Sequence, residues 1–304
     1  MRYLPHTEDE IREMLERVGV ERIDDLFEPI PASHRLERPL ALEPALSEPA
    51  LMRHISELGR RNEGPQMLSF LGAGCYEHHI PPAVDQLLLR SEFYTAYTPY
   101  QPELSQGTLQ AIFEFQTVVT QLFGLEVANA SMYDFASAAA EAVLMARRVT
   151  RRSAVTLSAG LHPHCLETIR TYVSGIDASP SIALAPIGAD GRTELDALRA
   201  SIGPDTAAVV IGYPNFYGCV EDLAAIQAVC EQHGALLISV TMEPYALALI
   251  EAPGVLGADI AVGEGQPMAV PPQYGGPGVG LFACRQKFAR QMPGRLVGRT
   301  TDKN

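Results

Sequence analysis

The segment with the clearest potential for chemistry is a glycine-rich turn near the C-terminus that would suit a working lysine and has none. Gly263–Pro267 follows an apolar run, and a second glycine-rich stretch, Gln273–Gly278, comes soon after it. A lysine in this turn could form a Schiff base with a carbonyl group. The chain has Gln266 there, and its two lysines are Lys287 and Lys303. The chemistry therefore depends on what replaces the missing amine.

A second candidate is the loop at residues 94–107, which is the part of the chain densest in polar and aromatic side chains. It contains three tyrosines, two prolines and one glutamate. Proline stiffening and aromatic density favour a loop that lines a site. The alternative is an ordinary loop before a helix that starts at residue 104, with Glu103 favoured by the dipole at the helix N-terminus.

Histidine, cysteine and glutamate cluster twice, but neither cluster has the spacing of a metal site. The first cluster holds Cys75, Glu77, His78 and His79, and the second holds His162, His164 and Cys165. Adjacent histidines point in different directions, and His162–Pro163 fits the start of a helix. The five cysteines form no CxxC pair, which argues against a zinc knuckle or a disulfide framework. We expect no metal.

Two further enzyme classes find little support in the sequence. A Cys/His hydrolase needs a base beside its thiolate, and no cysteine here has such a context. Gly276–Gly280 resembles a phosphate-binding glycine loop, but a dinucleotide fingerprint places its glycines between a strand and a helix. Because these glycines precede an apolar strand, a tight connection between strands is the better interpretation.

The elements that must position these residues alternate between short apolar segments and helical segments from residue 66 onward. The predicted strands are residues 68–71, 127–130, 154–157, 182–185, 207–212, 235–240, 259–262 and 279–283. Uninterrupted apolar strands that alternate with helices indicate an α/β domain whose mostly parallel sheet is covered on both faces. The last strand follows a glycine loop rather than a helix, so we expect it to be antiparallel.

The N-terminal region differs from the rest because it lacks strand periodicity. Thr7 and Glu10 form a capping-box pattern before a helix, and prolines then punctuate an extended arm. We predict an arm at residues 1–65, a large domain at 66–291 and the start of a smaller C-terminal domain at 292–304. The arm either packs across a partner subunit or wraps its own domain.

Composition and charge exclude several partners. The formal net charge is -13 and the pI is near 5.1, so the surface repels nucleic acid and anionic lipid. No apolar run reaches the roughly 18 residues that a membrane span requires. The N-terminus is acidic and lacks an apolar signal core. These features predict a soluble, cytoplasmic protein.

Several stretches together resemble the glycine decarboxylase P-proteins of the glycine cleavage system, and most closely the N-terminal or alpha subunit of the split bacterial form. The stretches are Ser91–Glu103, Val127–Asp134, Gly212–Gly218, Gly263–Pro267 with Gly275–Pro277, and Met292–Gly298. The resemblance covers essentially the whole chain. It implies the aspartate-aminotransferase-like fold of pyridoxal-phosphate enzymes, known as fold type I, in agreement with the alternating pattern.

The resemblance also implies two homologous subunits, alpha and beta, that have different roles in an alpha2-beta2 assembly. In this family the pyridoxal phosphate is bound by a lysine of the beta subunit. Glycine condenses with the cofactor and loses CO2, and its aminomethyl group passes to the lipoyl group of H-protein. Aligned on the glycine-rich turn, the lysine position falls on Gln266 and the aspartate that supports the pyridinium nitrogen falls on Ser239.

Neither replacement can do the original work, because Gln266 cannot form a Schiff base and Ser239 carries no charge for a pyridinium proton. The resemblance therefore implies a chain without a covalent cofactor that supports the partner's active site. The residues expected to line that site are Tyr94, Tyr97, Thr98, Tyr100, Gln101 and Glu103.

Two alternatives remain. The chain could be a self-sufficient pyridoxal-phosphate enzyme that uses Lys287, or a scaffold that binds partners without touching the chemistry. In the family the alpha subunit continues well past the Met292–Arg295 motif into a smaller domain, whereas this sequence ends at Asn304.

Overall fold

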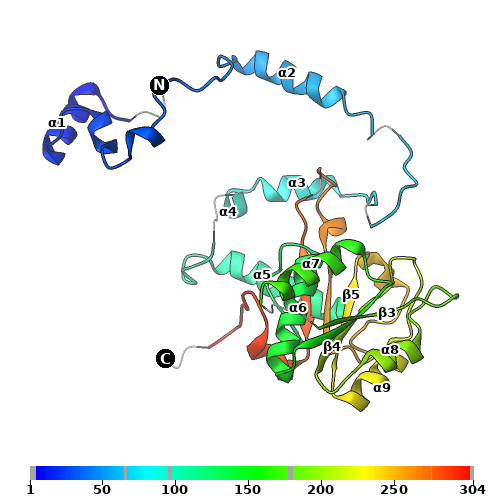
Figure 1. Cartoon of the computed structure of the whole chain (residues 1–304). Coiled ribbons are helices and arrows are strands. Elements are labelled where there is room, and N and C mark those ends of the chain that lie inside the picture. Colours follow the sequence, from blue (N-terminus) through cyan, green and yellow to red (C-terminus); the bar gives the residue numbers. More distant parts are fainter. Residues whose placement is uncertain are drawn as a thin grey trace. The chain divides into compact units, whose positions relative to one another are not determined.

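The computed structural model describes residues 5–64, 67–74, 76–94, 98–176, 181–274 and 276–301, and the chain divides into two units at residues 68 and 69 (Figure 1). The first unit contains α1 (Glu8–Val18), η1 (Ile23–Phe27), η2 (Ala32–His34) and α2 (Glu48–Arg60). The predicted capping box is present, since Thr7 and Glu10 bond each other's backbone N–H. No residue of these four elements is buried.

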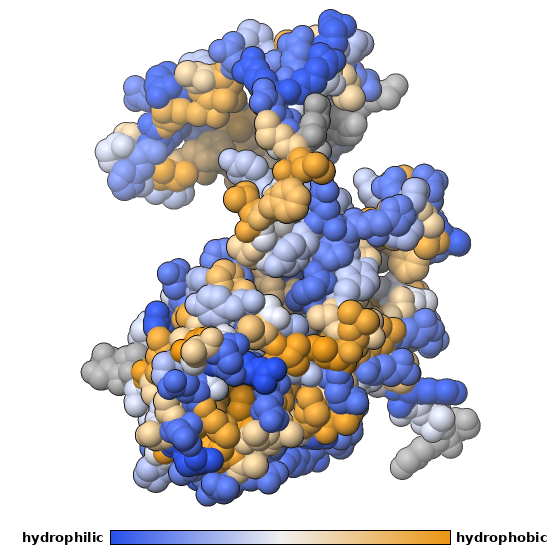
Figure 2. Space-filling model, turned by 90° about the vertical axis from the view of Figure 1, so that its right-hand side faces the viewer, coloured by the Kyte–Doolittle hydropathy of each residue, from blue (hydrophilic) through white to orange (hydrophobic). Residues whose placement is uncertain are grey.

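The predicted strand at residues 68–71 is wrong. These residues form no strand, and Leu68, Phe70 and Leu71 are each more than nine-tenths exposed. A short apolar run becomes a strand only where a neighbouring strand accepts its hydrogen bonds, and this run has no such neighbour among the described residues. Figure 2 shows that hydrophobic residues reach the surface beside hydrophilic ones.

The second unit is built on a sheet that contains seven strands within the described residues. The strands are β1 (Val127–Ala128), β2 (Ala154–Ser158), β3 (Ile182–Ala185), β4 (Thr206–Gly212), β5 (Leu236–Thr241), β6 (Ile260–Glu264) and β7 (Gly280–Cys284). Their order is β1-β7-β6-β5-β4-β2-β3. Strands β2 to β6 run parallel, and β7 is antiparallel to both β6 and β1. The predicted α/β fold and its antiparallel last strand are confirmed.

Helices cover both faces of this sheet (Figure 1). One face packs against α6 (Phe135–Thr150) and α7 (Pro163–Ser174), and the other against α8 (Leu195–Ser201) and α9 (Leu223–His233). Alternate residues of each central strand enter the two cores: Val210 faces α6, whereas Ile211 packs with α9. This double burial explains why the strands read as continuous apolar runs.

The remaining helices stand before the sheet in sequence. They are α3 (Pro82–Leu88), α4 (Ser91–Tyr94) and α5 (Gln106–Phe123). Val119 and Phe123 of α5 pack with Ala261 and Leu281 in a third core cluster, on the face opposite α6. No described helix is long and apolar enough to cross a membrane.

The Met292–Gly298 stretch packs within the second unit, against α5 and the residues that follow β1. Gln116 of α5 exchanges two hydrogen bonds of 2.9 Å with the backbone of Val297, and the Asn129 amide donates to the Pro293 carbonyl at 3.0 Å. The predicted domain boundary at residue 292 stays a prediction, because these contacts do not show what a smaller domain would contain.

Candidate functional site

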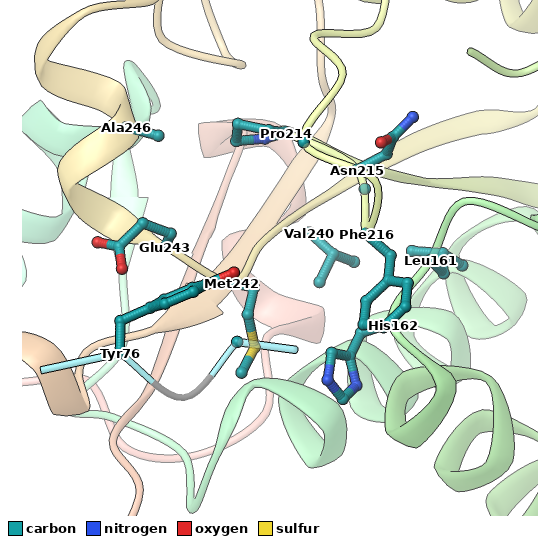
Figure 3. A pocket seen from close by; sticks show the side chains of 13 residues that line it. Tyr76, Leu161, His162, Pro214, Asn215, Phe216, Val240, Met242, Glu243 and Ala246 are labelled. Atoms are coloured by element: carbon teal, nitrogen blue, oxygen red, sulfur yellow. The ribbon is translucent and has the colours of Figure 1, made fainter. Parts of the chain in front are cut away.

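The candidate site lies where the parallel strands end. In open α/β sheets, ligands bind in the crevice at the carboxyl ends of the strands. A cavity of about 250 Å³ lies there, lined by segments that follow β2, β4 and β5 together with Gly74 and Tyr76. In Figure 3, Met242 lies between Tyr76 on one side and the rings of His162 and Phe216 on the other.

His162 forms one wall of this cavity as a neutral aromatic ring. Its Nδ1 accepts the backbone N–H of His164 at 3.1 Å, so its Nε2 carries the proton and donates to the Ala73 carbonyl at 3.0 Å. Burial lowers the pKa of His162, and the charge of the neighbouring His164 adds to this effect. The ring also meets Phe135 and Phe216 edge to face, at 5.3 and 5.1 Å between centroids. Both nitrogens are occupied, so His162 is not free to transfer a proton.

The histidine and cysteine clusters form no metal site in the described part of the chain, which contains no group of three possible ligands. The His162–Pro163 pattern does begin α7, with His162 as the N-cap. Burial raises the pKa of the Cys165 thiol to about 12, so this thiol is not a nucleophile. In the first cluster, His78 instead pairs with Glu243 at 3.0 Å, and Cys75 lies outside the described residues.

The N-terminus of α6 opens at the same edge of the sheet and is occupied by two carboxylates. Asp134 is the N-cap and accepts the Ser137 N–H at 2.8 Å. Glu264, the last residue of β6, is 6% exposed. Its Oε2 accepts the N–H of Phe135, the first residue of α6, at 3.2 Å.

The other carboxylate oxygen of Glu264 accepts hydrogen bonds from both ends of the glycine-rich segment. Its Oε1 accepts the N–H groups of Gln266 at 2.9 Å and Val279 at 2.7 Å. Burial raises the pKa of Glu264 above its ordinary value, against the opposite effect of these three backbone bonds. The sequence alone did not single out Glu264 or Asp134 as candidate site residues. The spacing of Asp134 and Ser137 is a recognisable capping pattern, which could have indicated the start of α6.

Gln266 and Ser239 do not point into the cavity together. Gln266 begins η5 (Gln266–Met268), and its side-chain amide donates to the Val270 carbonyl. Ser239 is fully buried within β5, and its hydroxyl has no hydrogen-bond partner among the described residues. Val240 lines the cavity and Ser239 does not, because successive residues of a strand face opposite sides.

The loop at residues 94–107 does not reach the cavity in its described part. Tyr94 and Tyr100 are mostly exposed, Gln101 and Glu103 are exposed, and Thr98 is half-buried; Tyr97 lies outside the described residues. The Arg295 guanidinium lies 5.1 Å from the centre of the Tyr100 ring. Helix α5 begins at Gln106 after Ser105, without a side-chain cap. The prediction that this loop lines a partner's site stays a prediction.

Lys287 lies at the opposite edge of the sheet. Its Nζ is 3.6 Å from Asp259 and 4.7 Å from the centre of the Phe288 ring. Asp259 immediately precedes β6, so this ion pair marks the amino ends of the parallel strands. Lys303 lies outside the described residues.

Comparison with known proteins assigns the family. The model of the glycine cleavage system P-protein family matches residues 1–304. The chain belongs to the glycine cleavage system P-protein family. It is 62% identical to the probable glycine dehydrogenase (decarboxylating) subunit 1 of Sorangium cellulosum, covering all of this chain and 68% of that protein. It is 54% identical to the protein of the same name from Anaeromyxobacter dehalogenans, covering 67% of it.

Solved structures agree with this assignment. A crystal structure of glycine decarboxylase (P-protein), in inhibitor-bound form, matches with a TM-score of 0.88 and 44% identity over all of this chain and 67% of that one. Glutamate decarboxylase from Lactobacillus brevis, at 18% identity and a TM-score of 0.62 over 84% of this chain and 62% of its own, shares the fold. The fold is that of the fold type I pyridoxal-phosphate enzymes, as predicted.

The residues of this P-protein family member do not fit the pyridoxal phosphate that its fold implies. The cofactor needs an amine for its aldehyde, a charged partner for its ring nitrogen and an anion site for its phosphate. Here the turn carries Gln266, and the α6 N-terminus holds Asp134 and Glu264. The β5 residue that lines the cavity is the apolar Val240, and the one carboxylate among the residues that line it, Glu243, pairs with His78 at 3.0 Å. The amine is absent, the carboxylate is already paired and the helix N-terminus is occupied, so the residues present do not fit the cofactor.

Proposed function

We propose that this chain is the subunit of a glycine-decarboxylating enzyme that holds no covalent cofactor, and that a homologous partner subunit supplies the lysine and the pyridoxal phosphate. The observation that carries the proposal is the combined mismatch at Gln266, Val240 and Glu264. Relatives that match over this whole chain are named subunit 1, which supports a second, different subunit.

The assembled enzyme would decarboxylate glycine and pass the aminomethyl group to the lipoyl group of H-protein, as an alpha2-beta2 complex in the cytoplasm. This chain would contribute binding and positioning. We propose Val240 rather than Ser239 as the counterpart of the pyridinium aspartate, because Val240 faces the cavity. An apolar side chain at this point cannot hold a proton on a ring nitrogen.

The partner would also cover apolar surface that this chain leaves open. Residues 1–65 contain α1 and α2, which bury no residue of their own. Ile55 of α2 and Leu42 before it are more than half exposed. Large exposed apolar patches on a folded chain are typical of interaction sites. We propose that this arm packs on the partner subunit and that residues 292–304 lead towards a smaller domain.

The decisive experiment combines this chain with its partner subunit and locates the cofactor. The purified chain is expected to be colourless, and borohydride reduction of the active complex is expected to label a lysine of the partner only. Glycine–bicarbonate exchange should need both subunits. A reduced label on Lys287 would support the self-sufficient enzyme instead. The Lys287→Met variant, which alters a side chain at the opposite edge, should keep full exchange activity.

A second experiment separates a site-lining subunit from a scaffold. Glu103→Ala and Tyr100→Ala should lower exchange activity several-fold in the reconstituted complex without loosening assembly. Glu114→Ala is the matched control, because Glu114 is an exposed residue of α5 that bonds only Gln110 among the described residues. Unchanged activity in all three variants would favour the scaffold.

A further inference from the structure

The N-terminus of α6 is the part of the site where the residues present differ most clearly from those that would bind the cofactor expected from the fold. We propose that Glu264, with Asp134, is a built-in replacement for a bound phosphate: its carboxylate occupies a latent oxyanion site and closes it from within. The inference concerns the stability and ligand binding of this chain alone, and it does not depend on its role in glycine decarboxylation.

The donors around Glu264 have the arrangement of an anion site. Three backbone N–H groups converge on its carboxylate from three separate segments: the first turn of α6, the glycine-rich turn after β6, and the residue before β7. Converging backbone N–H groups at a helix N-terminus bind phosphate and sulfate in many proteins. A single buried side chain takes all three of these donors.

The surrounding backbone leaves no room for a second anion. A Cβ atom at Gly278 would lie 3.2 Å from Glu264 Oε2 and 2.9 Å from Asp134 Cβ. A Cβ atom at Gly280 would lie 2.6 Å from the Asp134 carbonyl oxygen. The turn therefore closes directly over the carboxylates, and a phosphate could enter only in place of the Glu264 side chain.

Electrostatic repulsion also opposes the binding of phosphate at this helix N-terminus. Asp134 lies close enough to Glu264 to help raise the pKa of Glu264, and a phosphate dianion would meet the same repulsion. Asp134 also caps α6 through Ser137, so this helix needs no external anion. The chain can thus complete this part of its fold without a ligand, whereas a cofactor-binding relative would receive its anion from outside.

The test is rescue by inorganic phosphate. Glu264→Ala removes the carboxylate and leaves three backbone donors without their acceptor and an empty volume, so its Tm should fall by several degrees. Sodium phosphate should then restore a saturable part of that loss, compared with sodium chloride at equal ionic strength. The double variant Asp134→Ser, Glu264→Ala should bind phosphate at lower concentration, because the remaining repulsion is gone and serine keeps a cap.

Two controls make the outcome decisive. Wild type and Glu251→Ala, which alters an exposed glutamate, report the general stabilising effect of phosphate on folded proteins. If phosphate raises the Tm of Glu264→Ala no more than that of these controls, the proposal is overturned. A separate measurement covers the case in which the alanine variant does not fold. The Glu264→Gln variant keeps the side-chain volume, and its Tm should be clearly lower than that of wild type; equal Tm values for these two proteins would also overturn the proposal.

Discussion

Helices α6 and α7 begin at the same edge of the sheet, yet their N-termini are completed by opposite kinds of group. At α6 two carboxylates accept the free N–H groups, and the glycine-rich turn packs over them. At α7 a neutral imidazole, His162, accepts one N–H group and presents its ring to the cavity. One end is closed and anionic, and the other is uncharged and open to a ligand.

This difference shows that one helix N-terminus can be closed by side chains while a cavity stays open beside another at the same edge of the sheet. A helix N-terminus requires an acceptor, and either a side chain or a ligand can provide it. The wall that His162 forms needs only a flat ring held in place. The fold therefore accommodates a closed helix N-terminus and an aromatic cavity at the same edge.

The largest expected effect comes from disturbing the closed end. In Gly278→Ala the added methyl group would meet the Tyr133 carbonyl oxygen at 3.0 Å as well as Asp134, so it should destabilise the chain by about 1–3 kcal/mol. Urea unfolding measures this loss. Gly203→Ala is the control, because its Cβ would meet nothing within 4 Å. Equal midpoints for the two variants would show that the turn does not close tightly on α6.

Loss of the α6 cap should have a smaller effect. Asp134→Ala removes the acceptor for the Ser137 N–H and should cost about 1 kcal/mol. Asp134→Asn is the matched comparison, because an amide oxygen also caps a helix, and it should keep most of the stability. If asparagine is as harmful as alanine in urea unfolding, the charge of Asp134 matters more than its cap.

The open end should respond to pH. Because burial lowers the pKa of His162, the unfolded chain takes up a proton near the ordinary value of 6.5 before the folded chain does. The stability contributed by His162 is therefore present above that value and is lost as the pH falls through 6.5 towards the folded-state pKa. The advantage of wild type over His162→Asn should be constant well above pH 6.5 and should shrink as the pH falls below 6.5. A gap that widens on acidification would contradict the neutral tautomer.

The smallest effect is expected far from both helix ends. Lys287 is mostly exposed, and its pairing with Asp259 spans 3.6 Å, so Lys287→Met should change the free energy of unfolding by less than about 1 kcal/mol. Its unfolding midpoint should stay close to that of wild type. A large loss would mean that the buried Asp259 carboxyl depends on this amine.

The fold could be predicted from the sequence because each central strand is a continuous apolar run between helical segments. The same rule failed at Leu68–Leu71, since an apolar run does not reveal whether a neighbouring strand exists. The antiparallel β7 followed from the absence of a helix before it. The correct predictions and the wrong one have the same cause. A local apolar pattern becomes a strand only when a neighbouring strand is present to pair with it.

The candidate site was only partly predictable. The glycine-rich turn located Gln266, and alignment on that turn placed the pyridinium position on Ser239. Ser239 is buried away from the cavity, whereas its neighbour Val240 lines it, because successive residues of a strand face opposite sides. Glu264 lies within the Gly263–Pro267 motif, but the motif alone does not indicate what its carboxylate binds. Its bond to Phe135 joins residues 129 positions apart, which no local pattern reveals.

The position of Glu264 at the end of β6 has a consequence for how substitutions act on this chain. Its carboxylate holds α6, the glycine-rich turn and the approach to β7 at once, so removing it weakens three segments before any cofactor could bind. A lysine introduced at residue 266 would therefore find the neighbouring helix N-terminus already occupied. Emptying that terminus would first remove the contacts that join the three segments, so this part of the chain resists stepwise conversion into an anion site.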